Sequence, residues 1–247
     1  MTTLSLIGIG TGNPDHLTGQ AKRAIAEADL ILIPHKGRDK SDLADLRQCI
    51  VAKIRPTDDA TALFRMPVRD PALSYLDAVE DWHDEIARIW AEKIEQNPKA
   101  ETVALLVWGD PSLYDSTLRI AARILPMPRI EVVPGLTSLQ ILTAAHAIPL
   151  NTVGGAVVIT TGRRLRENGW PDGADTVVVM LDGNCAFQTL NATGIDVWWG
   201  AFLGMPEQIL KTGPLKQTGP DIIKTRAAAR ASHGWIMDIY LLRRRPV

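Results

Sequence analysis

The feature that most constrains the fold is an apolar run that ends at a Gly-Asp-Pro break. Val103–Val107 is continuously apolar and leads into Trp108-Gly109-Asp110-Pro111-Ser112-Leu113-Tyr114-Asp115-Ser116, before a helix-like segment at 117–125. Such a run is typical of a strand buried on both faces, and open α/β folds bind ligands just beyond the carboxyl ends of strands. Because Gly109 lacks a side chain and Pro111 lacks an N–H, a flat ligand can approach this backbone closely. An ordinary strand-to-helix turn is the alternative interpretation.

Two other predicted strands end in similar turns. Leu4–Ile9 runs into Gly10-Thr11-Gly12-Asn13-Pro14, and Ile130–Val133 runs into Pro134-Gly135-Leu136-Thr137-Ser138. Helices are expected after them, at Thr18–Ala28 and up to Ala145. Thr137 or Ser138 serving only as a helix cap is the plain interpretation of the second turn. The repetition of glycine-rich polar turns at three strand ends nevertheless favours a ligand site.

The glycine spacing near the amino terminus does not fit a dinucleotide-binding fingerprint. Asn13 stands where the third glycine would be, and Pro14 falls where a helix would begin on phosphate-binding N–H groups. The next apolar run, Leu30–Ile33, ends in Pro34-His35 rather than in an acid. A nucleotide-dependent oxidoreductase, or a non-catalytic ligand-binding protein, therefore remains only as an alternative from a different class.

Alternating strands and helices indicate an α/β fold, with a parallel sheet in the first half. A long helix is expected from an Asp70-Pro71 start to Glu95, with Leu73, Leu76, Val79, Ile86, Ile89 and Trp90 in the core. Turn-rich composition at Ile148–Gly155 places a domain boundary there, giving domains 1–150 and 151–247. Closely spaced strands in the second half indicate a mixed sheet. They are expected at Ala156–Thr160, Thr176–Leu181, Asp196–Leu203, Gln208–Thr212 and Trp235–Leu242, with a solvent-facing helix around Arg226–Arg230.

The three glycine-rich turns together resemble the motifs of a known family. Gly8–Pro14 with Leu17-Thr18, Gly109-Asp110-Pro111 and Val133–Ser138 are similar, in order and spacing, to those of the tetrapyrrole (corrin and porphyrin) methyltransferases, over essentially the whole chain. One departure is Thr11, where many relatives have proline. The resemblance implies two α/β domains, with a substrate trough in the first and an active site in the cleft between them.

Two further segments point to a branch of that family. Lys36–Leu43 and Met180-Leu181-Asp182-Gly183 look most like the deacetylating methylases of aerobic cobalamin synthesis, although His35 stands where those tend to have an acid. This implies C-methylation of a corrin precursor at ring carbon 1, with hydrolytic loss of acetate. The alternatives on the same fold are another precorrin methyltransferase, a ribosomal RNA 2′-O-ribose methylase or the diphthamide methylase.

The resemblance also implies a set of site residues. The donor S-adenosyl-L-methionine, which leaves as S-adenosyl-L-homocysteine, would contact Thr11, Gly109, Asp110, Pro111, Tyr114, Thr137, Ser138, Met180, Leu181, Asp182, Ala201, Phe202 and Leu203. The carboxylates of the tetrapyrrole call for cations. The cations proposed for them are Lys36, Arg38 and Lys40, and also Arg163, Arg164 and Arg166, all of which are plain solvated loop residues in the alternative interpretation.

Loss of an acetyl group requires a base for water and a donor for the developing oxyanion. His35, Asp110 and Tyr114 are the residues proposed for catalysis, with Asp182 a further candidate for the base. An exposed loop histidine that takes no part is the alternative interpretation of His35.

Composition excludes several other classes. A net charge of −1 disfavours nucleic-acid binding, and no apolar stretch approaches the roughly 20 residues that span a bilayer. No signal peptide is visible, which predicts a cytoplasmic protein. Cys49 and Cys185 do not have a metal-ligand spacing, so buried reduced thiols and no metal are expected. The family resemblance, with Trp198, Trp199, Phe202 and Trp235 in a small domain, predicts a homodimer.

Overall fold

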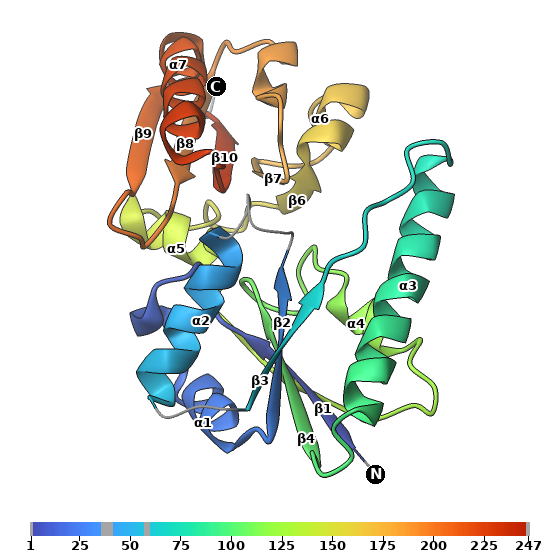
Figure 1. Ribbon diagram of the computed structural model, residues 1–247. Coiled ribbons are helices and arrows are strands. Elements are labelled where there is room, and N and C mark those ends of the chain that lie inside the picture. Colours follow the sequence, from blue (N-terminus) through green and yellow to red (C-terminus); the bar gives the residue numbers. More distant parts are fainter. Residues whose placement is uncertain (1, 36–41, 57–59, 246–247) are drawn as a thin grey trace. The chain divides into compact units, whose positions relative to one another are not determined.

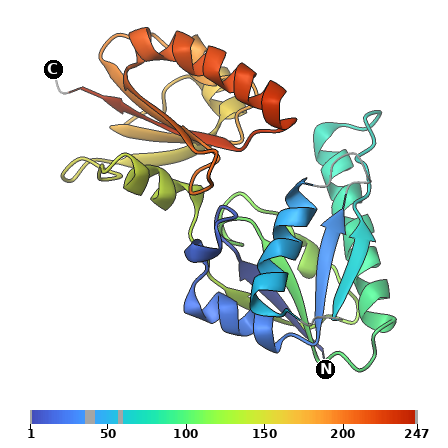
Figure 2. The same cartoon turned by 60° about the vertical axis from the view of Figure 1, so that its left-hand side comes forward.

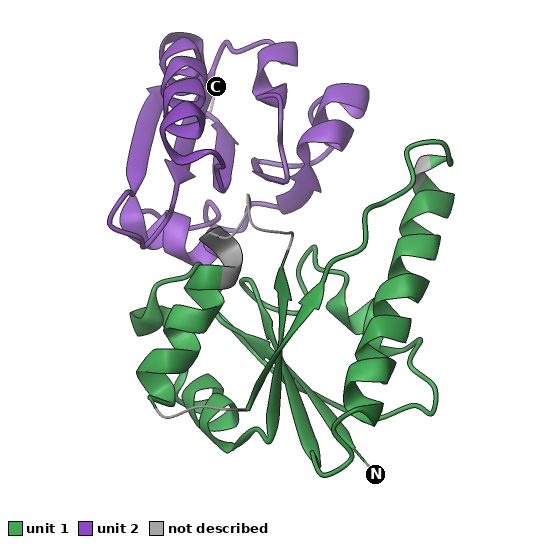
Figure 3. Ribbon diagram, viewed as in Figure 1, with its two compact units in different colours: residues 1–137 green, residues 138–247 purple. Residues whose placement is uncertain are grey.

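The computed structural model describes residues 2–35, 42–56 and 60–245, and the chain forms two compact units (Figure 3). The units are Met1–Thr137 and Ser138–Val247. This division lies before the predicted boundary at Ile148–Gly155, because helix α5 (Ser138–Ala145) packs Leu139 and Leu142 into the core of the second sheet. In the described residues, no helix is long and apolar enough to cross a membrane.

The first unit is a five-stranded, fully parallel sheet in the order β3-β2-β4-β1-β5. Figures 1 and 2 show α1 and α2 on one face and α3 and α4 on the other. The strands are β1 (Thr3–Gly8), β2 (Leu30–His35), β3 (Thr61–Arg65), β4 (Thr102–Val107) and β5 (Arg129–Val133). The helices are the 3-10 turn η1 (Pro14–His16), α1 (Gly19–Glu27), α2 (Asp42–Ile54), α3 (Tyr75–Glu95) and α4 (Thr117–Ala121). The predicted doubly covered parallel sheet is confirmed.

Each face of this sheet buries its own cluster of apolar side chains. Leu4, Leu32 and Leu105 pack with Trp90 of α3 on one side. Ile7, Ile31 and Leu106 pack with α1 and α2 on the other. Because both faces are covered, the strands read as continuous apolar runs, which is why the sequence identified them.

The second unit is a mixed sheet in the order β6-β7-β10-β8-β9. Its β6 and β7 are parallel, while β10 is antiparallel to both β7 and β8, so the carboxyl ends of β6, β7 and β8 share one edge. The strands are β6 (Val157–Thr161), β7 (Thr176–Met180), β8 (Ile195–Ala201), β9 (Ile209–Pro214) and β10 (Asp238–Arg244). Helices α6 (Gly162–Asn168), η2 (Ala186–Thr189) and α7 (Leu215–His233) complete the unit, and α7 lies along the sheet in Figure 2. The predicted mixed sheet is confirmed.

Several details of the sequence prediction are wrong. The long helix begins at Tyr75, not after Asp70, because the Ser74 hydroxyl caps it by accepting the Asp77 N–H at 3.3 Å. Consequently Leu73 and Leu76 are exposed (40% and 71%) instead of lying in the core, whereas Ile86 is fully buried. Strand β3 and helices α2 and α6 were not predicted.

The cysteines and tryptophans also differ in part from expectation. Cys185 is buried, as predicted, but Cys49 is exposed. Trp199 and Phe202 are buried within the second unit, and Trp235 packs against the same core. The aromatic residues of the second unit are therefore largely accommodated inside it, and they supply no argument for a dimer.

Candidate functional site

The predicted site residues of the first unit lie at the carboxyl edge of its parallel sheet. Because β4, β1 and β5 are neighbours in that order, the segments after them emerge side by side, and His35 ends the adjacent strand β2 at the same edge. These three segments begin at Trp108, Ile9 and Pro134. Two of the loops are joined by backbone hydrogen bonds, from Gly109 N–H to the Gly10 carbonyl at 2.7 Å and back at 3.3 Å. The glycine-rich turns at Gly10 and Gly109, which are distant in the sequence, are therefore directly joined in the fold.

The loops approach so closely that glycine is required where they meet. A Cβ added to Gly8 would lie 2.6 Å from the Gly135 nitrogen and 2.8 Å from the Gly109 carbonyl oxygen, and one added to Gly135 would come closer still to that oxygen. Gly109 differs from both. Its φ is +64°, and an added Cβ would meet only the Thr137 Cα, at 3.7 Å. Gly8 and Gly135 are thus required by loop packing, whereas Gly109 is favoured by its left-handed backbone and not by a lack of space for a Cβ.

Asp110 holds two of these loops together. One carboxylate oxygen accepts the Gly135 N–H at 2.9 Å, and the other accepts both the N–H of Ser112, at 2.9 Å, and its hydroxyl. Burial opposes the charge, but these hydrogen bonds outweigh it and lower the pKa of Asp110. A carboxylate with a lowered pKa and engaged oxygens is suited to fixing the loop rather than to taking a proton.

Left-handed backbone marks several of the predicted donor residues. Among the described residues, those other than glycine with positive φ are Tyr114, Ala147, Leu181, Cys185 and Phe202. Tyr114 and Leu181 are also exposed, 42% and 68%, whereas Phe202 is buried. Such backbone costs on the order of 1–3 kcal/mol and tends to persist at functional sites. Three of these five positions were proposed from sequence as donor contacts.

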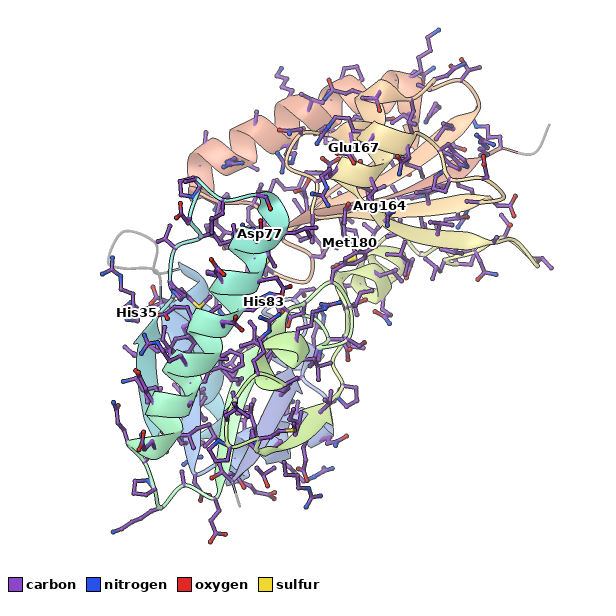
Figure 4. All side chains as sticks on the ribbon, turned by 90° about the vertical axis from the view of Figure 1, so that its right-hand side faces the viewer. His35, Asp77, His83, Arg164, Glu167 and Met180 are labelled. Carbon is purple, nitrogen blue, oxygen red and sulfur yellow. The ribbon has the colours of Figure 1, made fainter. Side chains whose placement is uncertain are left out.

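His35, labelled in Figure 4, is the last residue of β2 and is half-buried. It is paired in register with Arg65 of β3. The proposed cations Lys36, Arg38 and Lys40 lie outside the described residues. Arg163, Arg164 and Arg166 are not loop residues, because they belong to α6 directly after β6. The Arg164 backbone N–H is capped by the Thr161 hydroxyl at 3.4 Å.

In the second unit, Leu181 and Asp182 follow β7, and Phe202 and Leu203 follow β8, at the same sheet edge. Asp182 is buried, and its carboxylate accepts the Tyr240 hydroxyl at 2.6 Å and the N–H groups of Asn184 and Ala186. Burial, together with the charge of Asp182, raises the pKa of Tyr240 above its ordinary value. Asp182 therefore fixes the turn that carries Leu181.

A second set of hydrogen bonds, made by the side chain of Arg226 in α7, holds the turn that carries Leu181 and Asp182. Its guanidinium donates to the carbonyls of Asp182 and Gly183, each at 3.1 Å, and to both carboxylate oxygens of Asp238, at 2.8 and 3.1 Å. Asp238 also accepts the indole N–H of Trp199 at 2.9 Å. The side chains of Arg226 and Asp238 are only 12% and 7% exposed. The expectation that this arginine lies on a solvated face is wrong.

A model of the family Tetrapyrrole (Corrin/Porphyrin) Methylases matches residues 3–219. The chain belongs to this family. It is 47% identical over 251 residues to a Sinorhizobium sp. protein named precorrin-6A synthase [deacetylating], covering 99% of this chain and 96% of that one. It is 27% identical over 156 residues to a Sinorhizobium sp. precorrin-2 C(20)-methyltransferase, covering 59% of each.

Solved structures agree with the assignment to the tetrapyrrole methylases. A protein from Corynebacterium diphtheriae described as a putative cobalamin synthesis related protein (CobF) is 40% identical and superposes with a TM-score of 0.84 over all of both chains. The uroporphyrin-III C-methyl transferase of Thermus thermophilus complexed with S-adenyl homocysteine has the same fold, with 19% identity, a TM-score of 0.60, and coverage of 98% of this chain and 97% of that one. The chain is a methyltransferase, and the oxidoreductase alternative is not favoured.

Sequence reasoning on this methylase missed the side chains that support the site. Arg226 lies in an alanine-rich helix and Asp238 is the first residue of β10, with no motif around either. Their partners are backbone carbonyls and an indole far away in the sequence, so only the folded chain reveals the pairing. The sequence identifies Gly8 and Gly135 only as parts of motifs, whereas their role in loop packing depends on neighbouring backbone that is distant in the sequence.

Proposed function

We propose that this methylase transfers a methyl group from S-adenosyl-L-methionine to ring carbon 1 of precorrin-5, with hydrolytic loss of acetate, to give precorrin-6A in aerobic cobalamin synthesis. The observation that carries the proposal is the 47% identity, over 99% of the chain, to a precorrin-6A synthase [deacetylating]. The 40% identity to the CobF protein, with both chains fully covered, supports it.

The backbone around Gly109 and the left-handed turns fit the proposed donor. Gly109 has no side chain, and even an added Cβ would make only an ordinary contact with Thr137, so a flat adenosine-like group could approach its backbone closely. The left-handed residues Tyr114 and Leu181 are exposed and would be accessible to the donor. Ala201, Phe202 and Leu203 bury their side chains, so they would offer backbone atoms only. When bound, the donor supplies an electrophilic methyl group. The chain need only align the reactants and exclude water, which contributes about 7–11 kcal/mol.

For the acceptor, the cations proposed from sequence keep that role as part of this proposal. Arg163, Arg164 and Arg166 extend from α6 beside the edge that carries the Leu181 turn. Guanidinium groups there would bind acetate and propionate carboxylates in bidentate fashion. Lys36, Arg38 and Lys40 are proposed for the same task on the basis of the family resemblance alone.

The test is incubation of the purified protein with precorrin-5 and S-adenosyl-L-methionine. We expect precorrin-6A by mass analysis, with acetate and S-adenosylhomocysteine formed in equal amounts. Methyl transfer without acetate would instead assign the chain to another precorrin methyltransferase. Turnover of neither compound, in a protein that binds S-adenosylhomocysteine by calorimetry, would overturn the proposed substrate.

We also propose that the protein is a homodimer, on the basis of the family resemblance. Light scattering at micromolar concentration should then give about twice the chain mass of 27.0 kDa. A mass of one chain would overturn this part of the proposal and leave the chemistry untouched.

A further inference from the structure

A cavity of about 150 Å³, partly open to solvent, lies in the first unit at the carboxyl edge of its sheet. Residues at the ends of β2, β3 and β4 line it, together with residues of α2, α3 and α4. Its apolar wall includes Phe64, Trp82 and Trp90, and its polar wall includes Arg47, Asp115 and Ser116. Holding one water takes roughly 10–15 Å³, so this cavity can accept an organic group together with a water.

Arg47 of α2 is held in a fixed position at the polar wall. Its Nε donates to the Leu106 carbonyl at 2.9 Å, and its guanidinium carbon lies 4.8 Å from the centre of the Trp108 ring. Burial lowers the pKa of Arg47 to about 10, opposed by the charge of Asp115, so the group remains a cation at neutral pH. A guanidinium oriented in this way is a preorganised donor for an oxyanion.

Asp115 follows the strained Tyr114 in the Gly-Asp-Pro loop, which places it at the same cavity. Its Oδ1 accepts the Thr117 backbone N–H at 2.6 Å, and this bond fixes the carboxylate at the start of α4. The polar wall therefore combines a carboxylate and a guanidinium, and the rest of the lining is largely apolar. That combination suits a methyl ketone undergoing attack by water.

We propose that this cavity receives the acetyl group of the substrate, with Asp115 as the general base for water and Arg47 as the hydrogen-bond donor to the oxyanion. The inference rests on the proposed function and deepens it. Asp115 removes a proton from water as the water oxygen bonds to the ketone carbon, and the carbonyl electron pair moves to the oxygen, where Arg47 stabilises the charge. Collapse of this oxyanion restores the C=O bond and breaks the carbon–carbon bond to the ring.

The electron pair of the broken bond passes to the ring carbon, where the conjugated macrocycle holds it as an enamine-like nucleophile. The acetyl carbon leaves as acetic acid, which loses its proton as acetate. The carboxylates proposed from sequence are less suited to this role, because Asp110 and Asp182 each hold a loop through both oxygens. Asp115 instead combines a fixed orientation with a place on the cavity wall.

The first test replaces Asp115 with Asn, which keeps an oxygen to accept the Thr117 N–H. We expect acetate release from precorrin-5 to slow at least ~100-fold, the usual loss for a general base, while the affinity for S-adenosylhomocysteine changes less than twofold. The Asp115→Gly variant should recover acetate release on addition of formate, which fits the cavity and replaces the base. Wild-type rates in Asp115→Asn, or no formate rescue in a folded Asp115→Gly protein, would overturn the role of Asp115.

The second test replaces Arg47 with Gln, with Arg55→Gln as the matched control. Arg55 also donates to backbone carbonyls, those of Ile25 and Ala28, but it does not line the cavity. We expect ~100-fold slower acetate release for Arg47→Gln and little change for Arg55→Gln. Equal losses in the two variants would mean that Arg47 is only structural.

These outcomes are separable from failure of the proposed function. If the wild-type protein releases no acetate from precorrin-5, the deacetylating assignment fails. If it releases acetate and the cavity variants do so at the same rate, the function stands and the cavity assignment is wrong.

Discussion

At the residue scale, the three glycine-rich turns resolve into different physical roles. Gly8 and Gly135 are required because neighbouring backbone occupies the space of a side chain, whereas Gly109 has a positive φ and an added Cβ there would make only an ordinary contact with Thr137. A substitution at Gly109 should therefore affect the ligand surface more than the fold.

The first prediction concerns Gly109→Leu, with Gly194→Leu as its control. Gly194 has a similar φ of +71°, and an added Cβ there would meet nothing within 4 Å. Both variants should lose about 1–2 kcal/mol of unfolding free energy through left-handed strain. Only Gly109→Leu should abolish binding of S-adenosylhomocysteine, measured by calorimetry. Unchanged affinity in that variant would place the donor elsewhere.

A second feature at the residue scale is the buried imidazole of His83 in α3, labelled in Figure 4. It is 3% exposed, and neither ring nitrogen has a hydrogen-bond partner among the described residues. Burial, reinforced by the charges of Arg123 and Arg119 and opposed by those of Glu80 and Asp84, lowers its pKa. The folded state thus resists protonation that the unfolded chain accepts.

The second prediction follows from this lowered pKa. As the pH falls below about 6.5, the ordinary histidine value, the unfolded state binds more protons at this position and stability is lost. Thermal unfolding should show a larger loss between pH 7 and pH 5 in the wild-type protein than in His83→Leu, which cannot titrate. Parallel pH profiles for the two proteins would show that His83 contributes nothing.

At the scale of elements, the sequence predicted those with a strong periodic signal. Buried strands such as Val103–Val107 and the capped helix after Thr18 were found within a residue or two. Strand β3 was missed because it is a short edge strand at Thr61–Arg65, with one buried residue. Helix α6 was missed because Gly162–Asn168 is short and polar, and its Thr161 cap looks like the end of a strand.

In the candidate site too, only the features with a local sequence pattern could be predicted. Strand-end motifs could be predicted to converge, because parallel strands place their carboxyl ends at one edge. The hydrogen-bond partners of Asp110, Asp182 and Arg226 could not be predicted, since hydrogen bonds to distant backbone leave no local pattern in the sequence.

The third prediction concerns α7 and the turn after β7. Arg226→Gln leaves Asp238 buried without its cation, and breaking such a pair costs about 3–5 kcal/mol. It also releases the carbonyls of Asp182 and Gly183, so S-adenosylhomocysteine should bind at least ~10-fold more weakly. Arg230→Gln, an exposed position on the same helix, should change stability by less than about 0.5 kcal/mol.

Calorimetric measurement of S-adenosylhomocysteine affinity in these two variants decides whether Arg226 positions the Leu181 turn or only stabilises the fold. A destabilised Arg226→Gln protein with wild-type affinity, measured well below its unfolding temperature, would show that Arg226 does not position the Leu181 turn. The Arg226→Lys variant separates the effect of the charge from that of the hydrogen bonds. Its ammonium keeps the charge but cannot donate to Asp238 and to both carbonyls at once, as the planar guanidinium does.

At the scale of the whole molecule, the proposed chemistry divides unequally between the two units. The proposed donor contacts come from both units, whereas Arg47, Asp115 and the cavity all belong to residues 1–137. Loss of acetate is therefore assigned to the first unit alone. In the proposed mechanism it also comes first, because the ring carbon bearing the acetyl group has no electron pair to offer until the carbon–carbon bond breaks.

The last prediction follows from this order. With S-adenosylhomocysteine in place of the methyl donor, the protein should still release acetate from precorrin-5 in a single turnover. The ring carbon should then take up a proton, so the product should be one methylene lighter than precorrin-6A by mass analysis, and deuterium from D₂O should appear in it. The Asp115→Asn variant should suppress this release as strongly as it suppresses full turnover, because both require the same addition of water. If no acetate forms without a transferable methyl group, bond cleavage and methyl transfer occur in one step, and the first unit does not act alone.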